Sequence, residues 1–466
     1  MQLRQFVLEG LGHISALVAD DAAGVAAVVD PRRDVDLYLD EAKARGLRVS
    51  HVVETHLHND YVSGARELAA LSGAAHVHSA GAELRHPHQA VRDEESFDVG
   101  SLRFRVLETP GHTPEHVSYS VADRSRADEP QLLFTGGSLL VGAVGRTDLL
   151  GGDYAQPYAR LMHASLHDRL LRHEDSVTVL PTHGGGSLCS KDIATTPWST
   201  VGFERRHDSL LAIEEVEAFV RALLAEQPAF PRYFARMRPI NQAGPAPLGG
   251  VPRPQPLSVQ QVRTLHTGEG LVIDARRPED HAAGHIPGSL SIPAGSSFGT
   301  WLGWVVPHDR PLVLLLGSVD DWDRQVRQAL RIGHENVSGY LDGGLEAWRA
   351  SGGPVEVGAT ISVSDLAKRL EREPHLVVID VRQASEYEAG HVPGALHLHA
   401  GDLPDRLAEL PRDRPIVTMC ASGYRSSVAA GLLRQAGFGD VSAVRGGLPD
   451  WRAAGYPVAT GEPAPA

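Results

Sequence analysis

The second half of the chain contains a long internal repeat, and this repeat constrains the fold more than any other feature of the sequence. The run DARRPEDHAAGHIPG, which begins at Asp274, matches DVRQASEYEAGHVPG, which begins at Asp380, at an offset of 380 − 274 = 106 residues. Solenoid repeats have periods of about 20–50 residues, so a repeat of this length indicates two duplicated domains. Each copy is predicted to be a small doubly wound α/β domain, with helices on both faces of a sheet.

Length and composition place the whole chain among globular proteins with several domains. A chain of 466 residues is long enough for about three domains. The net charge of −14 disfavours nucleic acid or an anionic membrane as a partner. We find neither a membrane-spanning apolar run nor a signal peptide, and two cysteines fit a reducing compartment, so a cytoplasmic location is expected. The composition leaves a homo-oligomer open.

Changes in composition predict the domain boundaries. The segment 1–242 alternates short β-like runs with helical stretches and is predicted to form the first domain. Proline and glycine dominate 243–257, which indicates a stiff linker. The two copies of the repeat are then expected at 258–357 and 360–458.

The segment PIVTMCASGYRSS near the C-terminus predicts a reactive cysteine at the end of a strand. An apolar strand is expected at 416–419, a tight loop at 421–425 and a helix from about Ser426. Backbone N–H groups of such a loop bind anions and favour the thiolate of Cys420, which is the reactive form. Arg425 adds a guanidinium suited to an oxyanion. The alternative is a structural buried cysteine, the usual state of a free Cys.

The segments around this loop resemble the rhodanese family of sulfurtransferases. DVRQASEYEAGHVPG lies upstream and RGGLPDW downstream, in the order of that family. Four residues separate Cys420 from Arg425, one fewer than in the related cell-cycle phosphatases, and the resemblance implies that Cys420 carries a single sulfur as a persulfide. It also implies that Cys420 and Arg425 are the catalytic residues. The substrate-binding residues that it implies are Ala421, Ser422, Gly423, Tyr424 and Ser426.

The middle copy of the repeat lacks this chemistry. Leu316 stands where the last copy has Cys420, and Asp321 stands where it has Arg425. Leucine offers no nucleophile, and acidic residues would repel a sulfur anion. The middle copy is therefore interpreted as an inactive rhodanese-like domain with a structural or docking role.

Three loops of the first segment, each at the end of a predicted strand, carry histidines. ETHLHND contains His56, His58 and Asp60, PGHTPEH contains His112, and PTHGGG contains His183. The carboxyl ends of strands are where α/β sheets place ligands. Imidazoles with a nearby carboxylate are typical ligands of first-row transition metals. A lone pair of histidines is more often structural, but histidines on three such loops favour a metal site.

These loops resemble the metallo-β-lactamase superfamily, and within it glyoxalase II and the persulfide dioxygenases, which share a GRTD run also found here. The resemblance implies a four-layer α/β/β/α sandwich. By position, His56, His58 and His112 match the ligands of the first metal site of the superfamily. Asp60 and His183 match residues of its second site and are weaker candidates.

Two departures from that pattern bear on the metal. Tyr61 stands where the superfamily has a histidine, and Gly137 stands where it has a metal-bridging aspartate. A two-zinc site is therefore disfavoured, and we expect one metal ion, with iron (Fe2+) as the first candidate and zinc as the second. A site that has lost its metal is the alternative. Cys189, six residues after His183, is interpreted as a buried residue without a role, and a position near the metal is the alternative.

The whole architecture resembles persulfide dioxygenase–rhodanese fusions. The resemblance implies an enzyme in which the first domain oxidises a low-molecular-weight thiol persulfide and the last domain transfers sulfane sulfur through Cys420. Thiosulfate and sulfite are the expected small-molecule partners. Two alternatives stay open: the first domain is a glyoxalase II-like thioester hydrolase, or it is a metal-free scaffold without catalytic activity.

Overall fold

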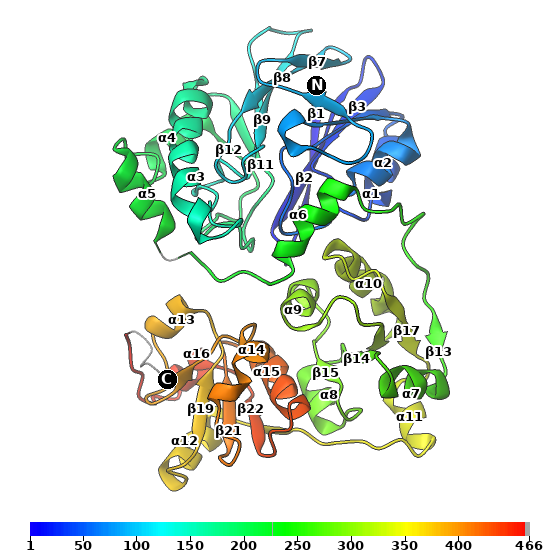
Figure 1. Ribbon diagram of the computed structural model, residues 1–466, viewed down its shortest axis with the longest axis vertical. Helices are drawn as coiled ribbons and strands as arrows, with labels where there is room; N and C mark the ends of the chain where they lie inside the picture. Colours follow the sequence, from blue (N-terminus) through cyan, green and yellow to red (C-terminus); the bar gives the residue numbers. More distant parts are fainter. Residues whose placement is uncertain (226, 462–466) are drawn as a thin grey trace. The chain divides into compact units, whose positions relative to one another are not determined.

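The computed structural model describes residues 1–225 and 227–461, which form two compact units. The first unit consists of Met1–Val251 together with Leu330–Gly333, and the second contains the remaining described residues from Pro252 onward. Each unit is built around its own sheets (Figure 1).

Two six-stranded sheets form the centre of the first unit. The first sheet has the order β1 (Gln2–Leu8), β2 (His13–Asp20), β3 (Val25–Val29), β4 (Arg48–Val53), β5 (Ala75–Ser79) and β6 (Gln89–Val91). The second has the order β12 (Ser199–Thr200), β11 (Thr178–Pro181), β10 (Leu132–Gly136), β9 (Val117–Asp123), β8 (Leu102–Glu108) and β7 (Ser96–Val99).

Helices cover the outer face of each of these sheets (Figure 1). The first sheet carries α1 (Asp36–Ala44) and α2 (Ala65–Ser72), and the second carries α3 (Gly152–Ala164), α4 (Val201–His207) and α5 (Val216–Leu224). Short helical turns follow at η1 (Ala80–Ala82), η2 (Ser165–Arg169) and η3 (Leu170–Arg172). Apolar side chains from both sheets, such as Val53, Phe104 and Phe134, form the core between them. The four-layer α/β/β/α sandwich expected for the first domain is thereby confirmed.

The second unit contains two five-stranded sheets with the same strand order. The first consists of β13 (Pro256–Leu257), β17 (Val337–Leu341), β16 (Leu312–Leu315), β14 (Leu271–Asp274) and β15 (Leu290–Ser291). The second consists of β18 (Ala359–Ile361), β22 (Val441–Val444), β21 (Ile416–Met419), β19 (Val377–Asp380) and β20 (Leu396–His397). All neighbouring strands are parallel, so the predicted duplication is confirmed at the level of topology.

The helices of the two copies correspond as well. The middle copy contains α7 (Val259–Thr267), α8 (Pro278–Ala283), α9 (Phe298–Val305), η4 (Val319–Asp321), α10 (Trp322–Arg331) and α11 (Gly344–Ala350). The last copy contains α12 (Val363–Arg372), α13 (Ala384–Glu388), α14 (Leu403–Arg406), η5 (Leu407–Glu409), α15 (Tyr424–Gln435) and α16 (Leu448–Ala453). In the last copy α12 and α16 cover one face of the sheet, and α15 packs against β21 and β22. Trp348 and Trp451 occupy equivalent places, and each indole N–H donates to a proline carbonyl six residues later.

A returning helix, α6 (Phe234–Ala243), closes the first unit beside the loop that follows β4. The buried amide of Asn241 donates to the carbonyl oxygens of His58 and Tyr61, each at 2.9 Å, and accepts from the Ser63 amide at 2.9 Å. The hydroxyl of Tyr233 donates to the Asp60 carbonyl at 2.9 Å. The end of the first domain therefore fixes the backbone of its histidine-rich loop.

The segment predicted as a linker is held in place over part of its length. The Glu67 carboxylate accepts the amides of Leu248 and Gly249, each at 3.1 Å, and the guanidinium of Arg66 donates to the Gly244 carbonyl. At its far end, Pro256 and Leu257 form the edge strand β13 and are no longer linker.

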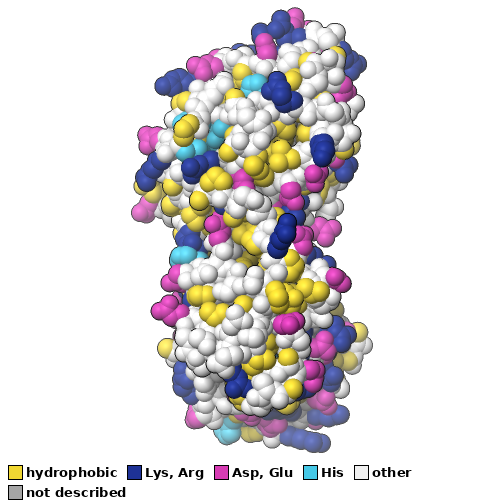
Figure 2. All heavy atoms as spheres, turned by 90° about the vertical axis from the view of Figure 1, so that its right-hand side faces the viewer, with side chains coloured by type: hydrophobic (Ala, Val, Ile, Leu, Met, Phe, Trp, Pro, Cys, Tyr) yellow, Lys and Arg dark blue, Asp and Glu magenta, His cyan; other side chains and the backbone are white. Residues whose placement is uncertain are grey.

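On the face drawn in Figure 2, basic and acidic side chains are intermixed over the surface of each unit. Among the described residues, we find no helix with both the length and the apolar composition that a membrane crossing requires.

Replacing Asn241 by alanine is expected to destabilise the first domain. The change leaves two buried carbonyls and one buried amide without their partner, and each such group costs about 1–3 kcal/mol. We therefore expect the free energy of unfolding of this domain to fall by at least about 2 kcal/mol, measured by denaturant unfolding. The matched control is Gln242→Ala, which removes one partly buried bond to the Ala82 carbonyl. An effect no larger than that of the control would contradict the role given to α6.

Candidate metal centre and cysteine loop

One buried carboxylate organises the loops at the ends of the strands in the first domain. Asp30 follows β3 directly, is 1% exposed and adopts a positive φ of 50°. Its Oδ1 accepts the Thr55 amide at 2.8 Å, and its Oδ2 accepts the Thr55 hydroxyl at 2.9 Å and the Thr182 hydroxyl. Thr55 and Thr182 are the residues immediately before His56 and His183. A single carboxylate therefore fixes the two histidine loops relative to each other.

Burial raises the pKa of Asp30, but the nearby His58 and the hydrogen bonds from Thr182 and Thr55 lower it to below its ordinary value. The carboxylate is therefore charged and acts as an acceptor. Sequence analysis did not single out Asp30, although an acidic residue directly after an apolar strand and before Pro31 was a usable signal.

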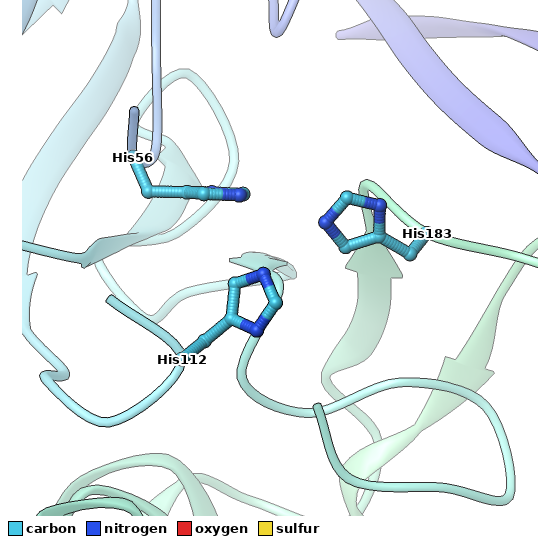
Figure 3. A group of neighbouring side chains, drawn as sticks. All are labelled: His56, His112 and His183. Carbon is cyan, nitrogen blue, oxygen red and sulfur yellow. The ribbon is translucent and has the colours of Figure 1, made fainter. Parts of the chain in front are cut away.

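Three histidines converge beside these loops. The ligand atoms of His56, His112 and His183 lie within 4.8 Å of one another, and all three side chains are buried. Their rings stand 5.0–5.5 Å apart between centroids (Figure 3). Imidazoles at this spacing, turned toward a common point, are able to hold one transition-metal ion.

Hydrogen bonds orient two of these rings. The Thr55 hydroxyl gives its proton to Asp30, so it accepts the Nδ1–H of His56 at 2.9 Å. The Nδ1–H of His112 donates to the carbonyl oxygen of Arg146, also at 2.9 Å. The Nε2 atom of each ring then carries the lone pair, and neither Nε2 has a hydrogen-bond partner in the described part of the chain. Burial, together with the neighbouring histidines, lowers the pKa of His112 to about 3 and that of His56 well below its ordinary value, so both rings are in the neutral, ligating form.

The structure departs from the expected ligand set at His58. Its Nε2 lies 3.4 Å from Oδ1 of Asp30, and its ring stacks on Tyr61 at 4.4 Å. Neither group of three metal-competent side chains found among the described residues includes His58. His183 takes the place of His58 as the third imidazole of the group. The sequence analysis had assigned His183 to a second metal site. Ligation by His58 stays a prediction.

Both departures from the superfamily pattern have a structural explanation. The Tyr61 ring fills the space beside His13 and His58, and its hydroxyl donates to the Asp30 carbonyl at 3.4 Å. A Cβ atom on Gly137 would lie 2.2 Å from Cδ2 of His112. The His112 ring therefore occupies the place where a side chain at 137 would begin, and Gly137→Asp requires the ring to move.

The GRTD run, residues 145–148, holds the loop of His112 in place through contacts of Arg146. The Arg146 guanidinium pairs with Asp148 at 2.6 and 2.8 Å and donates to the carbonyl of Leu188 at 2.9 Å. Its backbone amide donates to the Cys189 carbonyl at 2.9 Å. Because the Arg146 carbonyl also orients His112, Arg146 links the second histidine loop to the segment that carries Cys189.

A second group of possible ligands lies on the Asp60 side of His183. Asp60, His183 and Cys189 bring a carboxylate oxygen, a ring nitrogen and a thiol within 4.8 Å of one another, and all three are buried. The less favoured alternative for Cys189, a position near the metal-binding histidines, agrees with this arrangement.

In the last domain, Cys420 directly follows β21 at the base of its loop. Its sulfur is buried and receives the Gly423 amide at 3.1 Å, while the Ser426 hydroxyl lies 3.6 Å away. Gly423 has a φ of 93°, which turns its amide toward the sulfur. The helix α15 begins at Tyr424, two residues before the predicted start, so the helix N-terminus stands closer to the sulfur than expected.

Arg425 does not stand alone over the loop. Its guanidinium makes a two-pronged ion pair with Glu386 of α13 at 2.6 and 2.9 Å. Burial raises the pKa of Glu386, but the ion pair with Arg425 lowers it to below the ordinary value, so the carboxylate is charged. Glu386 lies in the EYEAGH run of the repeat, and sequence analysis gave it no role.

The middle copy contributes to the surroundings of the Cys420 loop. The Tyr424 hydroxyl donates to the Pro293 carbonyl at 3.0 Å, and Ser427 hydrogen-bonds Ser291 at 2.8 Å. The Trp304 ring packs on His399 with 4.7 Å between centroids. The inactive copy thus packs against the segment that carries the Cys420 loop of the last copy.

The loop of the middle copy is closed as a turn. Leu316 is 9% exposed, the Ser318 hydroxyl accepts the Asp320 amide at 3.2 Å, and Asp321 forms an ion pair with Arg324. This arrangement agrees with the interpretation of the middle copy as inactive, because the turn has no nucleophile.

Comparisons with known proteins agree with this architecture. Residues 10–183 match the metallo-beta-lactamase superfamily, and 258–351 and 362–454 each match the rhodanese-like domain. A crystal structure of a metallo-beta-lactamase from Staphylococcus aureus superposes with a TM-score of 0.66 and 29% identity, covering 73% of this chain and 98% of that one.

Two curated relatives each match part of the chain. A hydroxyacylglutathione hydrolase from Methylococcus capsulatus is 37% identical over 132 residues, 28% of this chain, and the chain spans about half (49%) of the length of that hydrolase. A sulfurtransferase from Allochromatium vinosum is 36% identical over 102 residues, which are 22% of this chain and 95% of that protein. The chain therefore belongs to the metallo-β-lactamase superfamily through its first domain and to the rhodanese-like domain family through the two domains that follow.

Proposed function

We propose that the chain is an enzyme of persulfide metabolism with two reactive centres. The first domain oxidises a low-molecular-weight thiol persulfide with the help of one metal ion, iron rather than zinc. The last domain transfers sulfane sulfur through a persulfide on Cys420. The observation that carries the proposal is that one chain joins a buried group of three imidazoles to a cysteine whose sulfur receives a backbone N–H at 3.1 Å.

The residues of the first centre fit a transition metal. Two buried Nε2 lone pairs and one further imidazole converge, and burial keeps His56 and His112 neutral. When bound, the metal supplies a Lewis-acidic, redox-active centre for the reaction of the persulfide with dioxygen and water, which gives the free thiol and sulfite. The chain itself orients the imidazoles through Thr55 and Arg146 and excludes bulk water from the site.

The second centre works through Cys420. Its thiolate attacks the outer sulfur of the donor, the donor's bond to that sulfur breaks, and the donor leaves with the electron pair. The Gly423 N–H stabilises the charged sulfur, and Arg425, held by Glu386, orients an anionic donor or acceptor. Transfer of the outer sulfur from Cys420 to sulfite yields thiosulfate, so the product of the first centre is an acceptor for the second.

A second candidate is a thioester hydrolase in the first domain. The similarity to a hydroxyacylglutathione hydrolase favours it. The absence of a carboxylate at Gly137 disfavours it, because that side chain would bridge the two metal ions of such a hydrolase.

Replacing Cys420 by serine is expected to abolish sulfur transfer from thiosulfate to a thiol acceptor. Serine keeps the size of the side chain but does not form a persulfide. The matched control is Leu316→Met at the equivalent place of the middle copy, which should leave the rate unchanged because that loop has no nucleophile. The measurement is the initial rate of sulfite release. Full activity in the serine variant would contradict the role of Cys420.

The Arg425→Lys variant tests the role of the two-pronged ion pair between Arg425 and Glu386. Lysine keeps the charge but reproduces neither the two-pronged contact with Glu386 nor the planar guanidinium that orients an anionic donor, so kcat/KM for thiosulfate should fall about tenfold. Arg452→Lys, at an exposed position on α16, is the control and should have no effect. If Arg425→Lys is as active as the control variant, a positive charge at position 425 is sufficient and the two-pronged ion pair has no role in sulfur transfer.

Metal content and oxygen uptake distinguish the candidate functions of the first domain. Protein purified without air and reconstituted with iron should bind iron and consume oxygen with glutathione persulfide. His112→Ala should lose both properties, because it removes one of three converging ligands, whereas His207→Ala, exposed at the end of α4, should keep them. Hydrolysis of a glutathione thioester without oxygen uptake would support the hydrolase instead. Failure of the unmodified protein to bind any metal would support a scaffold.

A further inference from the structure

A cavity of about 210 Å³ lies within the second unit, between the middle and the last copy of the repeat. The middle copy lines it with α8, the turn after α8 and Glu356, and the last copy lines it with the end of α15. Gln435 at the end of α15 donates to the Gly288 carbonyl at 3.1 Å, and α15 packs against β15, so the two copies are in contact beside the cavity. Cys420 precedes the first turn of α15, whereas the cavity adjoins its last turn, so the cavity is separate from the cysteine loop.

Arg434 brings a positive charge to this cavity from the last copy. Its Nη2 donates to the carbonyl oxygens of Val441 at 3.0 Å and Ala359 at 3.3 Å, and Gly358 leaves space for the guanidinium, because a Cβ there would stand 2.9 Å from Nη1. In the described part of the chain, Nε and Nη1 make no hydrogen bond and the guanidinium forms no ion pair. Burial lowers the pKa of Arg434 below its ordinary value, although the charge of Glu356 opposes this shift. The guanidinium is therefore a fixed cation whose charge is only partly compensated.

Two buried polar side chains of the middle copy line the same cavity. His281 is 2% exposed and Ser289 is 4% exposed. Among the described residues, neither Nε2 of His281 nor the hydroxyl of Ser289 has a hydrogen-bond partner. Burial, together with His285 and Arg434, lowers the pKa of His281 to about 2, so its ring is neutral and carries one N–H donor. Because buried polar groups are nearly always paired, these atoms indicate a polar occupant of the cavity.

The lining also includes an acidic residue, Glu356, which decides how strongly an anion would be held. Its side chain is 59% exposed, and its carboxylate lies 3.8 Å from Nε2 of His285. Solvent and salt screen an exposed charge more than a partly buried one. Arg434 therefore has the larger effect inside the cavity, and Glu356 weakens the attraction for an anion without reversing it.

We propose that this cavity is a binding site for a small oxoanion, held by Arg434, Ser289 and His281. A guanidinium presents N–H groups in the fork geometry that oxoanions accept, and the hydroxyl and the imidazole N–H supply further donors. Sulfur oxoanions and phosphate share this chemistry, so both belong to the class of ligand. The inference concerns binding at the boundary of the two copies and does not rest on the sulfur transfer proposed above.

The first test is a crystal structure of the unmodified full-length protein with selenate, an analogue of sulfate whose selenium scatters anomalously. The anomalous map should show a peak in the cavity within hydrogen-bond reach of the Arg434 guanidinium. This measurement needs no variant, so it does not depend on the folding of one. A cavity that holds only water would overturn the proposal.

The second test measures anion affinity in solution by calorimetry, with thiosulfate and phosphate as separate probes. The background is the full-length protein with Cys420→Ser and Arg425→Gln and without added metal, which has lost the nucleophile and the guanidinium of the cysteine loop. In this background Arg434→Gln should lower the affinity at least tenfold. Glu356→Gln should raise it, because it removes a like charge from the lining. The matched control is Arg372→Gln, exposed at the end of α12, which should leave the affinity unchanged.

The opposite signs expected for the two lining variants separate binding from general destabilisation, which would lower the affinity in both. The tighter of the two probes identifies the occupant as a sulfur oxoanion or as phosphate, and either order agrees with the proposal. An affinity in Arg434→Gln equal to that of the control, or a lower affinity in Glu356→Gln, would overturn it. Because neither test involves turnover, a failure here is distinguishable from a failure of the persulfide proposal.

Discussion

The metal centre depends on the buried carboxylate of Asp30. A charged group in the interior is stable only when it is compensated, and here the compensation comes from the Thr55 amide and the hydroxyls of Thr55 and Thr182. Each threonine precedes a histidine, so the same bonds that satisfy the charge also position His56 and His183. The hydroxyl of Thr55 in turn fixes the tautomer of His56. Loss of this carboxylate would release two loops at once, whereas loss of a single histidine removes one ligand.

The fold was predictable from the sequence because its signals are local or repeated. The offset of 106 residues between the runs at Asp274 and Asp380 required two copies of one domain, and both sheets have the same strand order. The site was only partly predictable. Histidine loops are visible in the sequence, but which ring reaches the common point depends on side-chain directions, and His58 turns toward Asp30 while His183 turns toward His56. The spacing of residues along the chain also did not reveal Glu386 behind Arg425.

The duplicated domains show how one copy can lose its chemistry and keep a structural role. The middle copy has lost the nucleophile at Leu316, yet it retains the sheet, and its Pro293 carbonyl holds Tyr424 of the last copy. The first domain shows a similar change, because Tyr61 and the His112 ring occupy space that metal ligands take in the superfamily pattern. In both cases the fold is kept, and other side chains stand at the positions of the expected reactive or ligating residues. We infer that the first centre is adapted to a single ion.

The central claim is that sulfite made in the first domain accepts sulfur from Cys420. The most direct test is to follow the products when the iron-loaded protein receives glutathione persulfide and oxygen. The account predicts that the unmodified protein releases mainly thiosulfate, whereas Cys420→Ser consumes oxygen at the same initial rate and accumulates sulfite. Equal yields of thiosulfate from the two proteins under conditions that prevent the uncatalysed reaction of sulfite with persulfide would contradict it.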